Sequence, residues 1–183
     1  MNGKTKVAIL IACLLCIGSA VGILISSKLR ARPQPVVKKA VFNSAAPAGP
    51  PDPSWSDNEL CMAVYDDNLQ KFKQLLDAQP DALNQGFGTL HSTLLHLAAR
   101  YGTPDIAREL LQRGADINAR TTQGHTPLFD AIDRSHIMMV TLLLEHGADT
   151  GIPDDTGQTP LQMAIANHHT GSTALLQKYG AKN

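Results

Sequence analysis

The chain has 183 residues and a formal net charge of zero, but its two ends carry opposite charge. Residues 1–56 contain seven Lys or Arg and one acid, whereas residues 57–183 contain nine Lys or Arg and fifteen Asp or Glu, a balance of 9 − 15 = −6. The acidic balance of the longer part argues against a nucleic acid as its main partner, and the basic end suits anionic lipid head groups.

A short basic tail, residues 1–6, precedes an uncharged apolar segment at residues 7–25. As a helix, this segment reaches roughly 28 Å, close to the hydrocarbon thickness of a bilayer. We expect one transmembrane helix or an uncleaved signal anchor. Two alternatives stay open: cleavage of a signal peptide near Ala20, where small residues cluster, and lipidation at Cys13.

Residues 26–56 are first basic and then rich in Pro and Ala. Closely spaced prolines exclude a helix or a central strand, so this segment is expected to be a semi-extended linker with polyproline-like stretches. It would hold the remaining chain, residues 57–183, away from a membrane surface.

From residue 57 onward one pattern recurs at a fixed interval. Thr93, Thr126 and Thr159 are 33 residues apart, and each is followed by Leu two positions later and Ala five positions later. Paired leucines and a Gly-Ala step close each unit. A weaker unit precedes these three, with Leu60 and Ala63 at the matching places. Because the apolar letters recur while the charges change, they mark the surface through which the units stack.

Each unit is expected to form two helices. Thr126 and Thr159 suit N-caps whose hydroxyls bond backbone N–H groups, and the following Pro127 and Pro160 suit the first helical position. Residues at i, i+3 and i+4 after each threonine are apolar, including Ile165 in the last unit, and are expected to face the core.

The second helices carry paired leucines, and Gly147 suits the left-handed position at which the second helix of the third unit stops. In the third unit the second helix begins with Ile137 and Met138, and one of these two is expected to lie exposed on the convex side. Polar stretches around Gln123-Gly124 and Thr156-Gly157 predict finger-like hairpin loops between the units.

This pattern resembles the ankyrin repeat, a unit of about 33 residues with a Thr-Pro-Leu-His-x-Ala core. The resemblance covers residues 57–183 and implies an all-α ankyrin-repeat solenoid of about four helix-turn-helix units with finger-like loops, preceded by the transmembrane helix. The expected repeats are residues 57–86, 87–119, 120–152 and 153–183.

Some positions depart from the family pattern. The family's histidine, which helps to tie adjacent repeats, is present only as His96, and Phe129 and Gln162 stand at the matching places. Ser135 and His168 replace the glycine that usually separates the two helices, which predicts strained or longer turns. The connection after Gly86, which leads into the second unit, is two residues longer than the later connections and predicts a distinctive loop there.

Residues suited to catalysis are not expected to converge. The seven histidines are dispersed, Cys61 is the one thiol after residue 56, and neither a phosphate-binding glycine loop nor a nucleophile elbow is found. An open array of helix pairs offers a groove rather than a water-poor pocket. The sequence therefore predicts no enzyme activity, catalytic residues, metal, cofactor or small-molecule substrate.

The resemblance also implies where a protein partner would bind, namely the finger tips and the concave side of the first helices. Carried over position by position, the candidate partner-binding residues are Phe87, Thr89, Arg100, Tyr101, Arg120, Thr122, Gln123, His125, Asp133, Arg134, Asp155, Thr156, Gln158 and Asn167. None of them belongs to the apolar stacking pattern, so their identities are expected to be available for recognition.

The whole chain is thus interpreted as a single-pass, membrane-anchored protein–protein interaction module. The alternative is an envelope inhibitor or immunity protein that blocks one enzyme or toxin. The arrangement of anchor, linker and repeats resembles bacterial envelope proteins with periplasmic ankyrin repeats. Because more basic residues follow the apolar segment than precede it, a location of the repeats on the cytoplasmic face stays open, as does secretion after cleavage near Ala20.

Overall fold

The computed structural model of the protein describes residues 56–181. This part is built from α-helices, one 3-10 helix and the loops between them, and the only bridge between extended residues in it pairs Phe87 with Ser92. In chain order the helices are α2 (Glu59–Tyr65), α3 (Leu69–Ala78), η1 (Pro80–Asn84), α4 (Leu94–Tyr101), α5 (Pro104–Gln112), α6 (Pro127–Asp133), α7 (Ile137–Glu145), α8 (Pro160–Ala166) and α9 (Thr170–Lys178).

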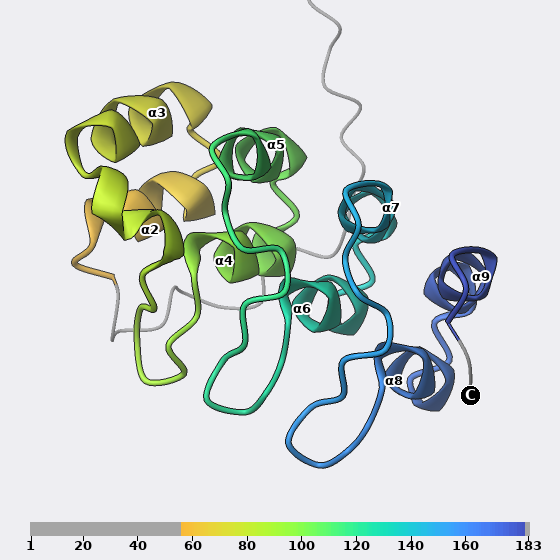
Figure 1. Ribbon diagram of the computed structural model, residues 1–183. Coiled ribbons are helices and arrows are strands. Elements are labelled where there is room, and N and C mark those ends of the chain that lie inside the picture. The colour runs from red at the N-terminus through yellow and green to blue at the C-terminus, as the bar shows by residue number, and fades with distance from the viewer. Residues whose placement is uncertain (1–55, 182–183) are drawn as a thin grey trace, which may run out of the picture. The chain divides into compact units, whose positions relative to one another are not determined.

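The α-helices form four antiparallel pairs, one in each of the expected repeats. The first helices α2, α4, α6 and α8 pack side by side in one row. The second helices α3, α5, α7 and α9 form a second row above them in Figure 1. Three hairpin loops extend from the row of first helices. We call residues 87–92, 120–125 and 153–158 the first, second and third finger. The expected all-helical repeat architecture is therefore confirmed.

The recurring apolar letters make the core. Leu95, Leu128 and Leu161 are at most 1% exposed, and the alanines three positions later are fully buried. Burial of such methyl groups between adjacent pairs is the main favourable term, because one helix pair cannot cover its own apolar side. The core thus runs continuously along the stack.

One expected core position is wrong. Ile132 is fully buried, whereas Ile165 at the matching place in α8 is 44% exposed. The difference has a simple cause: α8 covers the outer side of α6, and within residues 56–181 no further helix covers α8. The exposure expected on the second helix of the third repeat is confirmed, since Ile137 and Met138 are 41% and 62% exposed.

Helix starts follow the expected chemistry at most positions. Pro127 and Pro160 occupy the first helical position, and the Gln162 N–H donates to the Thr159 hydroxyl at 3.3 Å. Thr126 is the N-cap residue of α6, as expected, but its hydroxyl is buried without a partner, so the expected capping bond is wrong.

The turns between the helices of each pair are strained, as the missing glycines predict. Gly102 adopts a φ of 68°, and Ser135 and His168 adopt nearly the same left-handed conformation at 55° and 57°. Asp67 takes the matching place in the first repeat at 51°. A side chain at such φ costs about 1 kcal/mol relative to glycine, so three of the four turns store strain.

The membrane expectation falls on residues 7–25, which lie outside the described part of the chain. In residues 56–181 none of the helices has both the length and the apolar character needed to cross a bilayer.

Candidate functional site

The fingers and the first helices were the expected partner-binding surface, and the structure shows which of the candidate side chains are accessible there. Four of them lie exposed on the fingers without an ion pair or ring contact: Thr89, Thr122, Gln123 and Thr156. Asp133, Arg134 and Asn167 are exposed at or beyond the ends of α6 and α8. Gln158 is half-buried at the base of the third finger.

Phe87 is not at a finger tip. The backbone of Phe87 pairs with that of Ser92, with N–H···O distances of 2.8 and 3.0 Å, and the ring is only 8% exposed within the core. The first finger encloses residues 88–91 between this pair, one more residue than the other two fingers enclose. Because its ring closes the base of the finger, Phe87 was wrongly expected to be available to a partner.

Arg100 and Tyr101 also have structural roles. The Arg100 guanidinium donates to Asp130 Oδ1 at 3.0 Å, which joins α4 to α6. Burial alone would lower the pKa of Arg100, but the attraction of Asp130 outweighs it and raises that pKa. Tyr101 packs edge-on against Tyr65 of the first repeat, with ring centroids 5.1 Å apart. The expectation that these two side chains are independent of stacking is therefore wrong.

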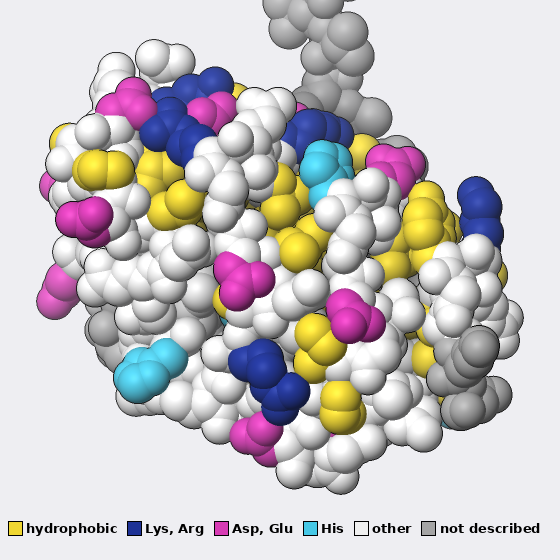
Figure 2. Space-filling model, viewed as in Figure 1, with side chains coloured by type: hydrophobic (Ala, Val, Ile, Leu, Met, Phe, Trp, Pro, Cys, Tyr) yellow, Lys and Arg dark blue, Asp and Glu magenta, His cyan; other side chains and the backbone are white. Residues whose placement is uncertain are grey.

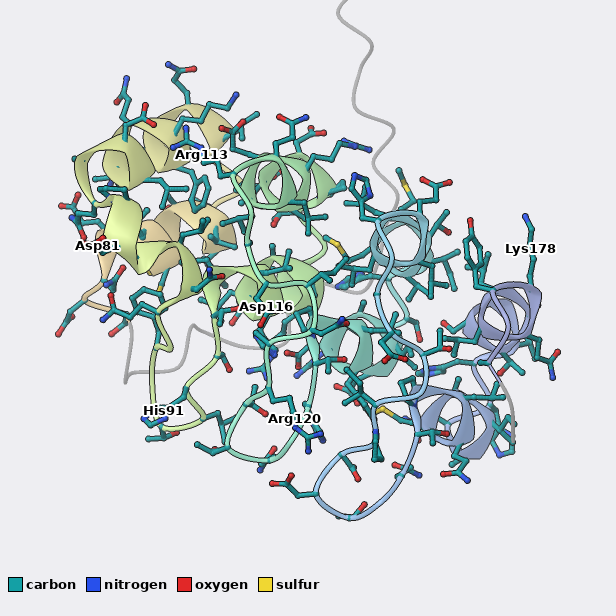
Figure 3. All side chains as sticks on the ribbon, viewed as in Figure 1. Asp81, His91, Arg113, Asp116, Arg120 and Lys178 are labelled. Carbon is teal, nitrogen blue, oxygen red and sulfur yellow. The ribbon has the colours of Figure 1, made fainter. Side chains whose placement is uncertain are left out.

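The fingers are joined to one another near their tips. The Thr122 N–H donates to the Leu90 carbonyl at 2.9 Å, and the Asp155 N–H donates to the Gln123 carbonyl at 3.1 Å. Arg120 adds an exposed ion pair with Asp155 at 2.9 Å. Figure 3 shows Arg120 on the second finger, directed toward the third. The backbone bonds fix the spacing of the fingers, while the ion pair stays open to solvent.

His125 lies at the base of the second finger and connects three repeats. Its carbonyl accepts a bond from His96 Nε2 at 3.0 Å, so the family's imidazole tie is present at this interface. Its ring stacks on the Phe129 ring with centroids 5.2 Å apart, and its Nε2 lies 3.8 Å from Asp154 Oδ2. The side chain is half-buried, so His125 supports the fingers more than it presents itself to a partner.

His96 is held as a neutral imidazole. Its Nδ1 accepts from the Thr93 N–H at 3.2 Å and lies 2.9 Å from the Thr93 hydroxyl, while Nε2 donates to the next repeat. Burial lowers the pKa of His96, against a smaller opposing effect of Asp130. A proton added at Nδ1 would meet the Thr93 N–H, so protonation opposes this cap.

Sequence reasoning missed two polar residues that shape the site. His136 lies against Gly102, where an added Cβ would be 2.9 Å from its Nδ1, and its Nε2 bonds the Arg100 carbonyl at 3.0 Å. Asp154 Oδ1 accepts from the Thr156 hydroxyl at 2.7 Å and from the N–H groups of Thr156 and Gln158 at 2.9 Å. Desolvation alone would raise the pKa of Asp154, but these bonds, the hydroxyl bond first, lower it. His136 and Gly102 lie about one repeat apart, so the sequence carried no local signal for the first.

Charges of both signs alternate over the face shown in Figure 2, without a large region of one sign. At the first two repeats several of these charges are paired: Glu109 binds Lys73 at 2.7 Å and Arg113 at 2.7 Å, and Arg113 binds Asp77 at 2.6 Å. These bonds lower the pKa of Glu109. The network joins α3 to α5 and presents little free charge.

The described residues contain few features of a catalytic or metal-binding site. No group of three His, Cys, Asp or Glu side chains within residues 56–181 converges as metal ligands would. Cys61 is fully buried, and desolvation raises the pKa of its thiol to about 12. An open groove of about 310 Å³ lies at the outer side of the fourth repeat, lined by Ile165, His168, Thr170, Thr173, Ala174 and Gln177. It brings together no acid–base pair.

Comparison with known proteins gives one family and several partial relatives. The family model described as ankyrin repeats (3 copies) matches residues 60–154, just over half of the chain. A probable E3 ubiquitin-protein ligase of Oryza sativa subsp. japonica is 38% identical over 91 residues, which cover 49% of this chain and 17% of that protein.

Two further relatives come from animals. The Neurogenic locus Notch protein of Drosophila melanogaster is 42% identical over 67 residues, covering 37% of this chain and 2% of that protein. Rabankyrin-5 of Mus musculus is 41% identical over 51 residues, covering 28% of this chain and 4% of that protein. The matched part is thus less than a fifth of the length of each of these three relatives, so their likeness concerns the repeats.

Proposed function

Because the chain belongs to the ankyrin-repeat family, we propose that it is a membrane-anchored module that binds a protein partner through its fingers and first helices. Ankyrin repeats generally mediate contacts between proteins, and stacked repeats offer an extended surface for this purpose.

The observation that carries the proposal is the contrast between fixed backbone and exposed side chains at the finger tips. Thr122 and Asp155 donate backbone bonds to the preceding finger, while Thr89, Gln123 and Thr156 expose their side chains to solvent. A surface whose backbone is already ordered loses little conformational entropy when a partner docks. Such a surface favours protein recognition over catalysis.

The proposed contact surface follows from the exposed candidates and is defined by these residues: Thr89, Arg120, Thr122, Gln123, Asp133, Arg134, Asp155, Thr156 and Asn167. Arg120 and Asp155 are included because an exposed ion pair is worth little and exchanges readily for a bond to a partner. Gln158 would contribute only at the margin, since it is half-buried.

The remaining parts of the chain are assigned by proposal too. Residues 7–25 would form the anchor, residues 26–56 the linker, and residues 57–183 the repeats, facing the periplasm of a bacterial envelope. The apolar length and the basic flanks of the first segment support this arrangement. A reporter that is active on only one side of the membrane, fused after Asn183, tests it; activity on the cytoplasmic side would reject the periplasmic location.

We further propose that the repeats bind without catalysing a reaction and without a cofactor, a nucleic acid or a small-molecule substrate. The acidic balance of residues 57–183 and the open form of the groove at the fourth repeat support this view. Turnover of a substrate by the purified chain alone would reject it.

Matched charge reversals on the full chain test the contact surface. Arg134→Glu alters the surface beside α6, and Arg108→Glu makes the same change on α5, where Arg108 has a similar exposed ion pair with Asp105. We expect Arg134→Glu to weaken capture of the physiological partner at least tenfold and Arg108→Glu to leave it unchanged. Equal effects of the two changes would contradict the proposed surface.

The nature of the captured protein separates this function from the inhibitor alternative. Reversible complexes that assemble without loss of the partner's activity support an interaction module. One tight complex with an enzyme or toxin, whose activity is then blocked, would support the inhibitor instead.

A further inference from the structure

The interfaces between successive repeats are not equally tied by polar bonds. Between the second and third repeats, three side-chain bonds cross the interface. His96 Nε2 bonds the His125 carbonyl at 3.0 Å, His136 Nε2 bonds the Arg100 carbonyl at 3.0 Å, and Arg100 binds Asp130 at 3.0 Å. Asn118 Oδ1 adds a fourth, accepting the Asp149 N–H at 3.0 Å.

The corresponding three bonds are missing between the third and fourth repeats, for reasons visible in the side chains. Phe129 stands at the place of His96 and has no nitrogen to donate. At the place of the Arg100–Asp130 pair, Asp133 is matched with Met163, which carries no charge. Two of the three ties are thus excluded by residue type alone.

The third tie is blocked by a Cβ atom. His169 matches His136, but the residue that its ring would have to lie against is Ser135 rather than glycine. At the preceding interface an added Cβ on Gly102 would come within 2.9 Å of the imidazole. His169 Nδ1 is buried without a hydrogen-bond partner among the described residues.

What remains at this interface is apolar packing and a few bonds at the finger tips. The Asp155 N–H donates to the Gln123 carbonyl, and the Arg120–Asp155 pair has side chains 42% and 57% exposed. An ion pair so exposed contributes little. The His125–Asp154 distance of 3.8 Å adds at most a weak attraction.

Buried polar atoms without partners are concentrated in the same two repeats. They include Thr126 Oγ1 and Asp130 Oδ2 in the third repeat and His169 Nδ1 and Ser172 Oγ in the fourth, against Thr103 Oγ1 alone in the second. Each such atom forfeits hydrogen bonds to water that unfolding would restore. Local opening of the fourth repeat would therefore recover solvation as well as chain entropy.

The first repeat, which like the fourth has a repeat neighbour on only one side within residues 56–181, is held differently. Glu109 of the second repeat, whose side chain is only 13% exposed, binds Lys73 of α3, and Asn84 Oδ1 accepts the Asp116 N–H at 2.9 Å. The Arg113–Asp77 pair, with side chains 29% and 65% exposed, adds little. Figure 3 shows Arg113 at the side of α5 that faces α3. A position at the end of the stack does not by itself remove the polar ties.

We propose that the fourth repeat, residues 153–181, opens as a unit by local unfolding while the first three repeats stay folded, because the ties of the preceding interface are absent from its contact with the third repeat. The third finger opens with it. The contact surface of the module then has a constant part on the first two fingers and a part that is present only in the closed state.

Hydrogen exchange of the full chain, followed by mass spectrometry under conditions where exchange reports opening equilibria, tests this inference. We expect amides of α8 and α9 to exchange at least tenfold faster than those of α4 and α6, and faster than those of α2 and α3. Ser135→Gly removes the blocking Cβ and lets His169 bond the Asp133 carbonyl. This change should slow exchange in α8 and α9 about fivefold, the factor that one net hydrogen bond is worth.

Asp67→Gly is the matched control, because Asp67 has the same left-handed φ in the first repeat. It relieves the same kind of strain and should leave exchange in α8 and α9 unchanged. Exchange of α8 and α9 at the same rate as α4 and α6 would overturn the proposal. Fast exchange that Ser135→Gly does not slow, or that Asp67→Gly slows equally, would overturn it as well, since the missing tie would then not be the cause.

Discussion

Arg100 on α4 and Asp130 on α6 form an ion pair at 3.0 Å whose side chains are only 22% and 7% exposed. One oxygen of the carboxylate binds the guanidinium, and the other is buried without a partner. A charge held in this way depends on its counter-charge, because water cannot replace the missing bonds.

Removal of the cation should therefore be costly. Arg100→Ala is expected to lower the free energy of unfolding by about 2 kcal/mol, because it leaves the Asp130 carboxylate unpaired in a nearly closed site. Arg108→Ala, which breaks the exposed pair with Asp105, should cost about 0.5 kcal/mol or less. Urea unfolding of both variants measures the difference. Equal decreases in the free energy of unfolding would show that the Arg100–Asp130 pair stabilises the fold no more than the exposed pair does.

Acid should weaken the fold through His96. Burial holds its pKa in the folded chain below the ordinary value of 6.5, so as pH falls through 6.5 the unfolded chain takes up a proton that the folded chain does not. Stability is thus full above about pH 7 and declines toward pH 5. The free energy of unfolding, measured between these two values, should fall with pH. His136, whose pKa is also lowered by burial, adds to the same slope.

His96→Gln isolates the first contribution. Gln162 already shows that glutamine at this position accepts the N-cap N–H, here from Thr159 at 3.0 Å. The variant should keep the cap, lose the bond to the second finger at a cost of about 1 kcal/mol at pH 7.5, and flatten the decline toward pH 5. An unchanged slope would mean that His96 does not cause the acid sensitivity.

The strained turns predict opposite effects of glycine and serine at matched positions. His168→Gly should raise the free energy of unfolding by about 0.5 to 1 kcal/mol, because the left-handed φ no longer conflicts with a Cβ. Gly102→Ser should lower it by about 2 kcal/mol, since its Cβ would also meet the His136 ring. Thermal unfolding of both proteins checks the signs, and a loss in the first variant would refute the strain.

Cys61 should report on unfolding. The thiol is fully buried and its pKa is raised to about 12. At neutral pH a reagent therefore cannot reach the sulfur, and the sulfur is not ionised to the reactive thiolate. N-ethylmaleimide is expected to leave Cys61 unmodified in the native chain and to modify it fully in urea, as measured on the peptide that contains it. Rapid native modification would show that α2 opens easily.

The Asp154 carboxylate organises the third finger, and a pair of substitutions separates its two properties. Asp154→Asn keeps an oxygen that accepts from Thr156 and Gln158, whereas Asp154→Ala keeps none. We expect a loss of about 2 kcal/mol for alanine and less than half of that for asparagine. If both variants lose the same amount, the charge rather than the acceptor holds the finger.

The fold could be predicted from the sequence because the residues that indicate it act locally and recur in each repeat. Pro127 and Pro160 mark helix starts, and the apolar positions recur at the helical spacing and again after 33 residues. Ile165 was misjudged because its surroundings depend on a neighbour rather than on its own helix. Periodicity tells which side of a helix is apolar and does not tell whether anything covers that side.

The candidate site was less predictable for a related reason. Polar residues outside the apolar pattern were assigned to partner recognition, as if they had no structural role. Arg100 and Arg120, however, each pair with an acid about one repeat later. Pairs of opposite charge separated by 30 and 35 residues carry no local signal. Thr122 and Gln123 lie exposed on a loop, as the turn chemistry around Gly124 predicts, and their role in partner binding stays a prediction.

The polar ties give the stack a fixed order that its shared apolar skeleton does not supply. If the second and third repeats exchanged places, Asp130 would face Tyr65, and Arg100 would face Met163. Every methyl group could still be covered, yet both charges would lose their partners. The units of this protein are thus alike as building blocks but not interchangeable, and duplication or shuffling of one of them would have to be followed by new pairings at its edges.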